Sequence, residues 1–78
     1  MDRFRFPDDL IRAQQEWHDT YRALAVPTPG RTLLRRRLLR LSVRIEGHAF
    51  WSTPVGTPAA RVELRRRAGG ERRSEGAA

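Results

Sequence analysis

The chain is 78 residues long and contains no cysteine, so it forms one domain at most and no disulfide bond can stabilise it. A domain this small buries only about 60% of the surface of its unfolded chain, which makes its stability marginal. Asp2, Asp8 and Asp9 stand where a signal peptide would be basic and then apolar, and no apolar run reaches the length of about 20 residues that spans a bilayer. We therefore expect a soluble, cytoplasmic protein, a setting that the lack of cysteine also fits.

The charge of the chain is strongly positive and unevenly distributed. All 16 basic residues are Arg, and with 9 acidic residues the formal net charge is +7. Residues 1–25 carry 4 Arg and 5 acidic residues (net −1), residues 26–54 carry 6 and 1 (net +5), and residues 55–78 carry 6 and 3 (net +3). The positive charge is therefore concentrated in the middle and the end of the chain. It is carried by Arg, whose planar guanidinium group binds phosphate and carboxylate well.

The first predicted helix spans about residues 8 to 25. Asp8 and Asp9 place carboxylates in its first turn, where the helix dipole favours negative charge. At about 100 degrees per residue, five side chains fall on one narrow stripe, and charged or polar residues fall opposite it. This pattern predicts an amphipathic helix whose core-facing residues are Leu10, Ala13, Trp17, Tyr21 and Leu24.

A proline-rich corner over residues 26–30 cannot continue the helix, because two prolines remove backbone donors and Gly30 permits a tight turn. Beyond it, Thr32 is predicted to cap a second helix over residues 33–45. This helix has two apolar stripes and one arginine arc, so we expect it to contact two neighbouring elements and to expose one cationic side. The stripes are Leu34, Leu38, Leu41 and Ile45 and, beside them, Leu39 and Val43; the arc holds Arg36, Arg37, Arg40 and Arg44.

Residues 38–45 leave a second interpretation open. Leu39, Leu41, Val43 and Ile45 alternate with polar residues, which is the period of a strand. We favour a helix because the wider segment is longer than a usual strand and is rich in Leu and Arg, which are strong helix formers. The alternation by itself does not exclude the strand.

The last third of the chain predicts a loop, a short helix and a tail. Residues 48–56 form a loop in which Phe50 and Trp51 cover the core, and Thr57 caps a helix from residue 59 to about residue 67, with Pro58 in its first position. The remaining residues have almost nothing to bury, so we expect a disordered basic tail. The predicted fold class is all-α, a helical hairpin plus a short third helix, with a small helical domain over residues 1–67 and a tail over residues 68–78.

Four segments of the chain carry a resemblance: Phe6-Pro7-Asp8-Asp9-Leu10, the stripe from Gln15 and Trp17 through Tyr21 to Leu24, Leu38-Leu39-Arg40-Leu41-Ser42, and His48-Ala49-Phe50-Trp51. Together they resemble small uncharacterised actinobacterial helical proteins with a two-helix core. The resemblance covers about residues 4 to 67, and Ala49 departs from it because those proteins commonly have proline there. It implies a helical fold and a cytoplasmic setting, and it implies no activity.

The residue types present do not indicate a catalytic site. The chain has no Cys and no Lys, its serines are Ser42, Ser52 and Ser74, and no triad or dyad can be recognised. Its two histidines, His18 and His48, stand apart from any close-spaced set of three or four metal ligands. We therefore predict no enzyme, no metal site and no cofactor, with His18 flanking a helix face and His48 hydrogen-bonded in a loop.

Two binding functions fit the sequence. The first is a protein-interaction module that binds a partner protein or a second copy of itself, because a marginal core carries several large apolar side chains. The alternative is nonspecific nucleic-acid binding by the arginine arc, which lacks any motif that reads bases. Membrane-surface binding is disfavoured because the second helix would have to leave its neighbours to insert. The predicted interaction or core residues are Trp17, Tyr21, Leu34, Leu38, Leu41, Ile45, Phe50 and Trp51, and the predicted nucleic-acid-binding residues are Arg36, Arg37, Arg40 and Arg44.

Overall fold

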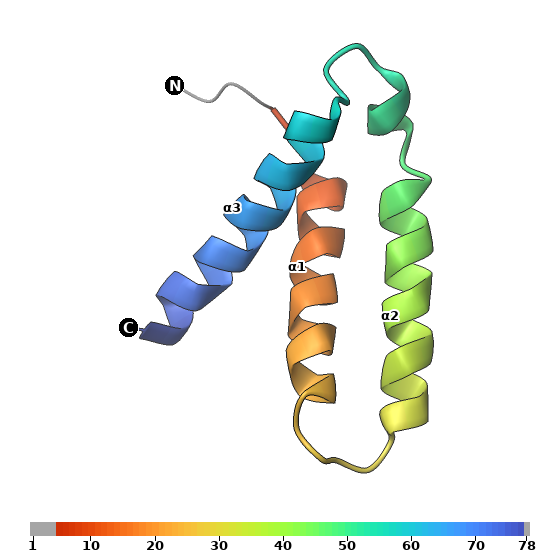
Figure 1. Cartoon of the computed structure of the whole chain (residues 1–78), viewed down its shortest axis with the longest axis vertical. Coiled ribbons are helices and arrows are strands. Elements are labelled where there is room, and N and C mark those ends of the chain that lie inside the picture. Colours follow the sequence, from red (N-terminus) through yellow and green to blue (C-terminus); the bar gives the residue numbers. More distant parts are fainter. Residues whose placement is uncertain (1–4, 78) are drawn as a thin grey trace.

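The computed structural model describes the backbone of residues 5–77 and the side chains of residues 5–69. Within these residues it has no strand and four helical elements (Figure 1): α1 (Asp8–Leu24), α2 (Arg31–Glu46), the short 3-10 helix η1 (Ala49–Ser52) and α3 (Pro58–Ala77). The all-α prediction is confirmed, and residues 38–45 belong to helix α2 rather than to a strand. None of the described helices combines the length and apolar character that crossing a membrane would need.

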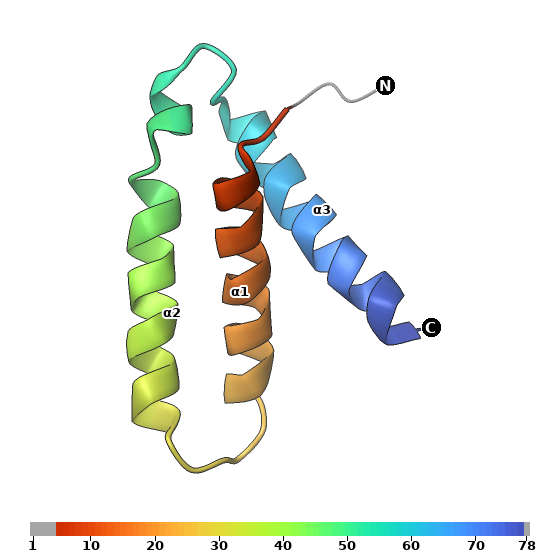
Figure 2. The same cartoon turned by 180° about the vertical axis from the view of Figure 1, so that it is seen from behind.

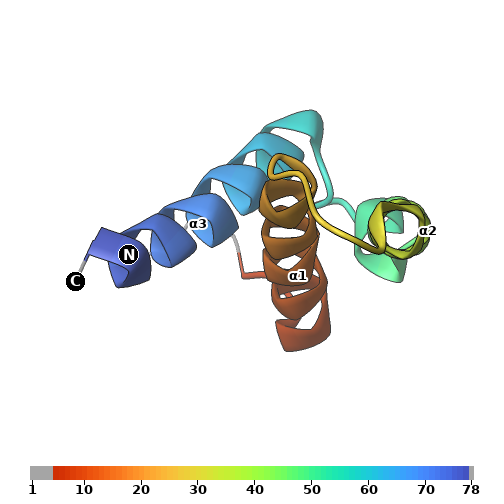
Figure 3. The same cartoon turned by 90° about the horizontal axis from the view of Figure 1, so that it is seen from below.

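Helix α1 is the centre of the fold. α1 and α2 form an antiparallel hairpin, α3 packs on another side of α1, and α1 lies between the other two helices when the molecule is seen from below (Figure 3). α3 begins beside the start of α1 and diverges from it toward the C-terminus (Figures 1 and 2). α2 has little contact with α3, which it meets where Glu46 pairs with Arg61. The predicted pair of neighbours for α2 is therefore wrong, because α1 is the helix that packs along it and α3 is held away by α1.

The bounds and most of the core-facing residues of α1 are as predicted from the sequence. Two acidic residues lie in its first turn, and it ends at Leu24, before the proline-rich corner. Leu10 and Ala13 are buried, and Trp17 and Leu24 are half-buried. Tyr21 lies outside the core, because it is 57% exposed and stacks on the Trp17 ring at a centroid distance of 5.2 Å.

The corner between α1 and α2 is made by a glycine rather than by a threonine cap. Gly30 precedes α2 with a φ of 82°, a left-handed conformation that favours glycine, and its carbonyl accepts from the Leu34 N–H at 3.1 Å. The predicted Thr32 cap is therefore wrong: Gly30 turns the chain into the helix two residues earlier, and no side chain caps α2. The Arg31 guanidinium donates to the Leu24 carbonyl at 2.8 Å and ties the two helix ends together.

The core lies between α1, α3 and the end of α2. Leu10 and Leu64 are fully buried, and Ala60 and Ala68 lie four residues to either side of Leu64 on α3. The small side chains of Ala60 and Ala68 let α3 approach α1 closely, because they project little from the surface of the helix. The buried cluster consists of Phe6, Leu10, Ala13, Ile45, Phe50, Ala60 and Leu64.

The short helix η1 covers one end of this core, as predicted for its two aromatic residues. Phe50 is buried against Phe6 at a ring-centroid distance of 5.4 Å, and Trp51 stands edge-on to Phe50 at 5.1 Å. The Trp51 indole N–H donates to the Ile45 carbonyl, and the Phe50 N–H donates to His48 Nδ1 at 3.1 Å. These bonds fix η1 to the end of α2.

α3 is longer than predicted. Its start is as expected, because Pro58 occupies the first position and the Thr57 hydroxyl accepts from the Ala60 N–H at 3.1 Å. The helix then runs to Ala77 instead of ending near residue 67, and Ala68 is fully buried, since it continues the apolar spacing of α3. The packed part thus extends past the predicted domain boundary. The rest of the predicted disordered tail, residues 70–78, lies outside the residues whose side chains are described.

His18 lies at the contact between α1 and α3, where Gly69 packs against its ring. Burial lowers the pKa of His18 from its ordinary value of 6.5; the backbone of Arg65 opposes this effect and the charge of Arg22 adds to it. Between the folded pKa and 6.5 the unfolded chain therefore binds a proton at His18 more readily than the folded chain does.

Acidification below pH 6.5 should consequently lower the free energy of unfolding, while His18 contributes its full stabilisation above that pH. Urea titrations over a pH series at fixed ionic strength measure this slope. The variant His18→Gln, which cannot titrate, should lose the slope in this window. A wild-type free energy that stays level as the pH falls below 6.5 would contradict the assignment.

Candidate interaction surface

The side of α2 turned away from α1 carries large apolar residues that no described element covers. Leu33, Leu39 and Val43 are 67%, 66% and 64% exposed. At about 100 degrees per residue Leu39 and Val43 lie across the helix from buried Leu41 and Ile45, whereas Leu33 lies about 80 degrees from Leu41, on the side of the helix that holds Arg36, Arg40 and Arg44. We call this surface the outer face of α2, and it consists of Leu33, Arg36, Leu39, Arg40, Val43 and Arg44.

Three of these residues, Arg36, Arg40 and Arg44, form an arginine ladder along the outer face. Their four-residue spacing places them one above the other, about 6 Å apart along the helix axis. All three are exposed, and among the described side chains none of them forms an ion pair. Like charges at this spacing cost a few tenths of a kcal/mol per pair, a repulsion that an anionic partner would relieve.

Three of the four predicted nucleic-acid-binding arginines border one groove. Arg37, Arg40 and Arg44 line a hollow of about 200 Å³ where α2 meets Glu16 of α1, so the edge of the outer face that holds Arg40 and Arg44 borders α1. Arg37 lies 3.6 Å from the Glu16 carboxylate, so part of its charge is balanced within the chain. Arg36 is not part of this groove, and the structure therefore does not gather all four arginines at one place.

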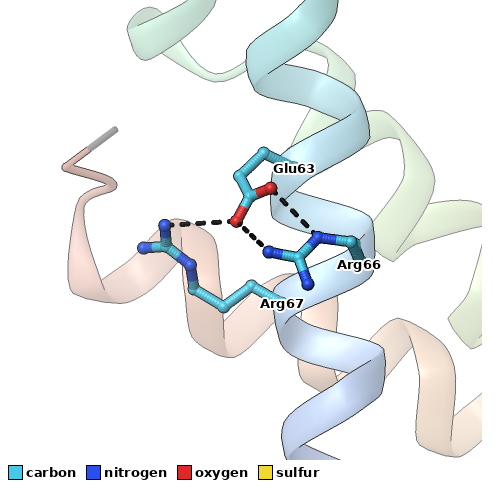
Figure 4. A network of polar contacts seen from close by, with 3 residues as sticks. All are labelled: Glu63, Arg66 and Arg67. Atoms are coloured by element: carbon cyan, nitrogen blue, oxygen red, sulfur yellow. Dashed lines mark hydrogen bonds and ion pairs between the residues drawn. The ribbon is translucent and has the colours of Figure 1, made fainter. Parts of the chain in front are cut away.

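The arginines of α3 are arranged differently, because most of those described are paired. Glu63 accepts from Arg66 Nε at 3.1 Å and Nη2 at 2.8 Å, and from Arg67 Nη2 at 3.3 Å (Figure 4). The Arg66 guanidinium holds the pKa of Glu63 below its ordinary value. Arg61 pairs with Glu46 across to α2. The longest run of unpaired positive charge among the described side chains thus lies on α2.

A second hollow, of about 310 Å³, is lined by residues of all three long helices, α1, α2 and α3. Its polar groups have partners within the chain: the Trp17 indole N–H donates to Ser42 Oγ at 2.9 Å, and the Ser42 hydroxyl donates to the Leu38 carbonyl at 2.9 Å. The Gln14 amide lies 3.3 Å from His18 Nε2. Because these three side chains have partners within the chain, we assign no binding site to this cleft, which is lined by Gln14, Trp17, Ser42, Ile45, Glu46 and Arg65.

The structure divides the predicted interaction or core residues by location, and most of them hold the fold together. The exposed apolar residues are others: Leu39 and Val43 were expected to be covered by a second neighbouring element or by a partner, and Leu33 was not singled out. The signal for Leu39 and Val43 in the sequence was the second apolar stripe, along which none of the described helices packs. Of the predicted set, Leu41, Ile45 and Phe50 are buried, Trp17, Leu34, Leu38 and Trp51 are half-buried, and Tyr21 is exposed.

The two histidines hold structural positions in the described part of the chain, which contains no group of three or more metal-ligating side chains. His48 Nε2 lies 3.0 Å from the Asp9 carboxylate, and His48 Nδ1 accepts from the Phe50 N–H. The hydrogen bond to His48 holds the pKa of Asp9 below its ordinary value. His48 thus joins η1 to the first turn of α1, in agreement with its predicted bonding in a loop.

Residues 9–67 match a family model described as a domain of unknown function, DUF8825. No curated protein and no solved structure matched the chain. The matched region contains α1, α2, η1 and the first half of α3, which are the elements that supply most of the buried cluster.

Proposed function

The chain belongs to the DUF8825 family of domains of unknown function, and we propose that it is a non-enzymatic protein-interaction module that binds its partner through the outer face of α2. One observation carries this proposal. Leu33, Leu39 and Val43 are each about two-thirds exposed on a helix that has one helical neighbour along its length.

The energetic argument rests on how these residues are grouped. A single exposed apolar side chain is ordinary on a protein surface, whereas several on one helix face form a patch of the kind that binds another protein. Fully burying one Val or Leu side chain contributes about 1.5–3 kcal/mol. Leu39 and Val43 lie one helical turn apart, so a single partner element would cover both.

The arginine ladder favours an unlike partner over a second copy of the chain. Two copies that met through their outer faces would bring Arg36, Arg40 and Arg44 of one copy close to the same residues of the other. Like charges brought together at a contact are destabilising, and the formal net charge of +7 on each copy adds long-range repulsion. We therefore propose a heterologous protein partner.

Crosslinking and mass spectrometry in cells that make the protein test this proposal. We expect the wild type to capture a defined protein that the Leu39→Ser/Val43→Ser variant loses. The control Val55→Ser/Val62→Ser removes two other apolar residues, 55% and 63% exposed, and should keep the partner. If the Leu39→Ser/Val43→Ser variant captured the same protein as the wild type, the outer face would not be the binding surface.

Nonspecific nucleic-acid binding is the second candidate, and the groove lined by Arg37, Arg40 and Arg44 favours it. Arginines that neutralise phosphates release counterions, so such binding would weaken steeply with salt. The groove offers no side chain of the kind that reads adenine, such as Asn or Gln, and therefore supports binding without a sequence preference.

We further propose a cytoplasmic setting and an actinobacterial source. The absence of cysteine supports the first, because a small exported domain is commonly stabilised by disulfide bonds. The use of Arg at all 16 basic positions supports the second, since it fits GC-rich coding. Immunoblots of cell fractions test the setting directly.

A further inference from the structure

We propose that the partner of the outer face is an acidic amphipathic helix of another protein, which lays its apolar stripe on Leu39 and Val43 and sets carboxylates against the arginine ladder, beside which Leu33 lies. This inference rests on the proposed function and adds the chemistry of the partner to it. It joins two observations on the same surface, the exposed apolar residues and the unpaired arginines.

Charge complementarity identifies the partner as acidic. Glu46, the acidic residue of α2, already pairs with Arg61, and Glu16, at the edge of α1, already lies beside Arg37. The chain therefore has no acidic side chain left among these to balance the ladder. Carboxylates of a partner would meet guanidinium groups that present two donors side by side, which is the geometry in which arginine binds carboxylate best.

The spacing of the residues on the outer face favours a helix over an extended strand as the partner. Leu39 and Val43 are four residues apart, and so are successive members of the ladder, so both rows run along the axis of α2. The 16 residues of α2 extend over about 24 Å, enough for a partner helix to place apolar anchors at i, i+4, i+7 and i+11 along it. Glu or Asp residues beside that stripe would recur at the interval of the ladder.

The apolar residues distinguish this partner from a nucleic acid. A phosphate backbone offers hydrogen-bond acceptors and charge, and it would leave Leu33, Leu39 and Val43 without apolar contacts. On the outer face these three residues are interleaved with the arginines rather than separated from them. A ligand that covers the arginines must therefore also cover apolar surface, as an amphipathic helix does.

Fluorescence anisotropy with synthetic peptides tests the inference. The probe is a labelled helical peptide of about 18 residues with Leu at i, i+4, i+7 and i+11 and Glu on both flanks of this stripe. One matched peptide has Lys in place of Glu, and a second has Ser in place of Leu. Labelled duplex DNA is titrated in parallel. Each titration is run at about 50 and about 200 mM salt, because contacts between exposed charges weaken as salt screens them.

Three variants separate the two components of the surface. Arg36→Gln/Arg40→Gln/Arg44→Gln removes the ladder, and its control, Arg5→Gln/Arg12→Gln/Arg22→Gln, removes the same charge from exposed positions elsewhere. Leu39→Ser/Val43→Ser removes the apolar contacts. All substituted side chains are exposed, and circular dichroism confirms that each variant is folded before it is titrated.

We expect the acidic peptide to bind the wild type and its control, and to lose about tenfold in affinity with either the ladder variant or the apolar variant. We expect the Lys peptide and the Ser peptide to bind at least about tenfold more weakly than the probe. Equal binding of the Lys peptide, or an unchanged affinity in the ladder variant, would overturn the inference while leaving apolar docking as the proposed function.

Two other results would also overturn it. Duplex DNA that binds more tightly than the acidic peptide, and that depends on the ladder without depending on Leu39 and Val43, would assign the surface to nucleic acid. If no peptide binds, the acidic helix is excluded as the partner, and the capture experiment decides separately whether the outer face binds another protein.

Discussion

Replacing Leu64 by Ala is expected to remove a large part of the free energy of unfolding of the protein. Leu64 is fully buried between α3 and α1, and truncating a buried Leu to Ala costs about 2–5 kcal/mol through lost burial and the cavity left behind. A domain this small lies near the lower end of the usual stability of about 5–15 kcal/mol, so the loss removes much of the total. Urea denaturation followed by far-UV circular dichroism measures it.

Leu39→Ala is the matched control, because it makes the same chemical change at a leucine that is 66% exposed. Its free energy of unfolding should stay within about 0.5 kcal/mol of the wild type. The pair therefore separates a leucine that holds the fold from a leucine available for binding. Equal losses in the two variants would mean that the outer face of α2 is covered in the free protein, and the proposed binding surface would be lost with it.

The second large effect is expected at Gly56, in the loop between η1 and α3. A Cβ atom at this position would clash with the Phe50 carbonyl oxygen and lie 2.6 Å from the Trp51 Cα. These are backbone atoms, which cannot turn aside as a flexible side chain does, so Gly56→Ala must displace η1 from the core. We expect the free energy of unfolding to fall by about 1–3 kcal/mol, the usual cost of overpacking. We also expect a red shift of tryptophan emission as Trp51 becomes more exposed to solvent.

Gly47→Ala is the control for this substitution. A Cβ there would meet a single atom, the Val43 carbonyl oxygen, at 3.1 Å, and Gly47 has a φ of −90° that any residue can adopt. Its effect on stability should therefore be smaller than that of Gly56→Ala. Equal stability of Gly56→Ala and the wild type would show that the loop repacks freely and that η1 is not held in place by the close approach of Gly56.

Local chemistry allowed much of the fold to be predicted from the sequence. The acidic first turn and the apolar stripe of α1, the prolines of the corner and the Thr57 cap are short-range signals, and each is confirmed. The corner itself shows the limit of such signals. Thr32 has the right side chain for a cap, but the left-handed Gly30 begins the helix first, and a backbone conformation of this kind depends on the whole connection between α1 and α2.

The binding surface could be predicted only in part, for a physical reason. Periodicity shows which side chains share a face of α2, and the second stripe was recognised through Leu39 and Val43. Whether that stripe is covered depends on where α3 packs, and Ala60, Leu64 and Ala68 place α3 on α1 instead. Tyr21 shows the opposite error, because it shares the predicted core stripe of Trp17 yet is 57% exposed and stacks on the Trp17 ring.

The central position of α1 has a consequence for the order of events during synthesis. α1 leaves the ribosome before either of its neighbours, and α2 follows after a short corner, so the hairpin can close before α3 has emerged. Until Leu64 emerges, the buried cluster lacks the residues that α3 supplies, and the nascent hairpin exposes apolar surface of α1 that α3 later covers. The order of the elements along the chain thus makes α3 the last helix that can join the core.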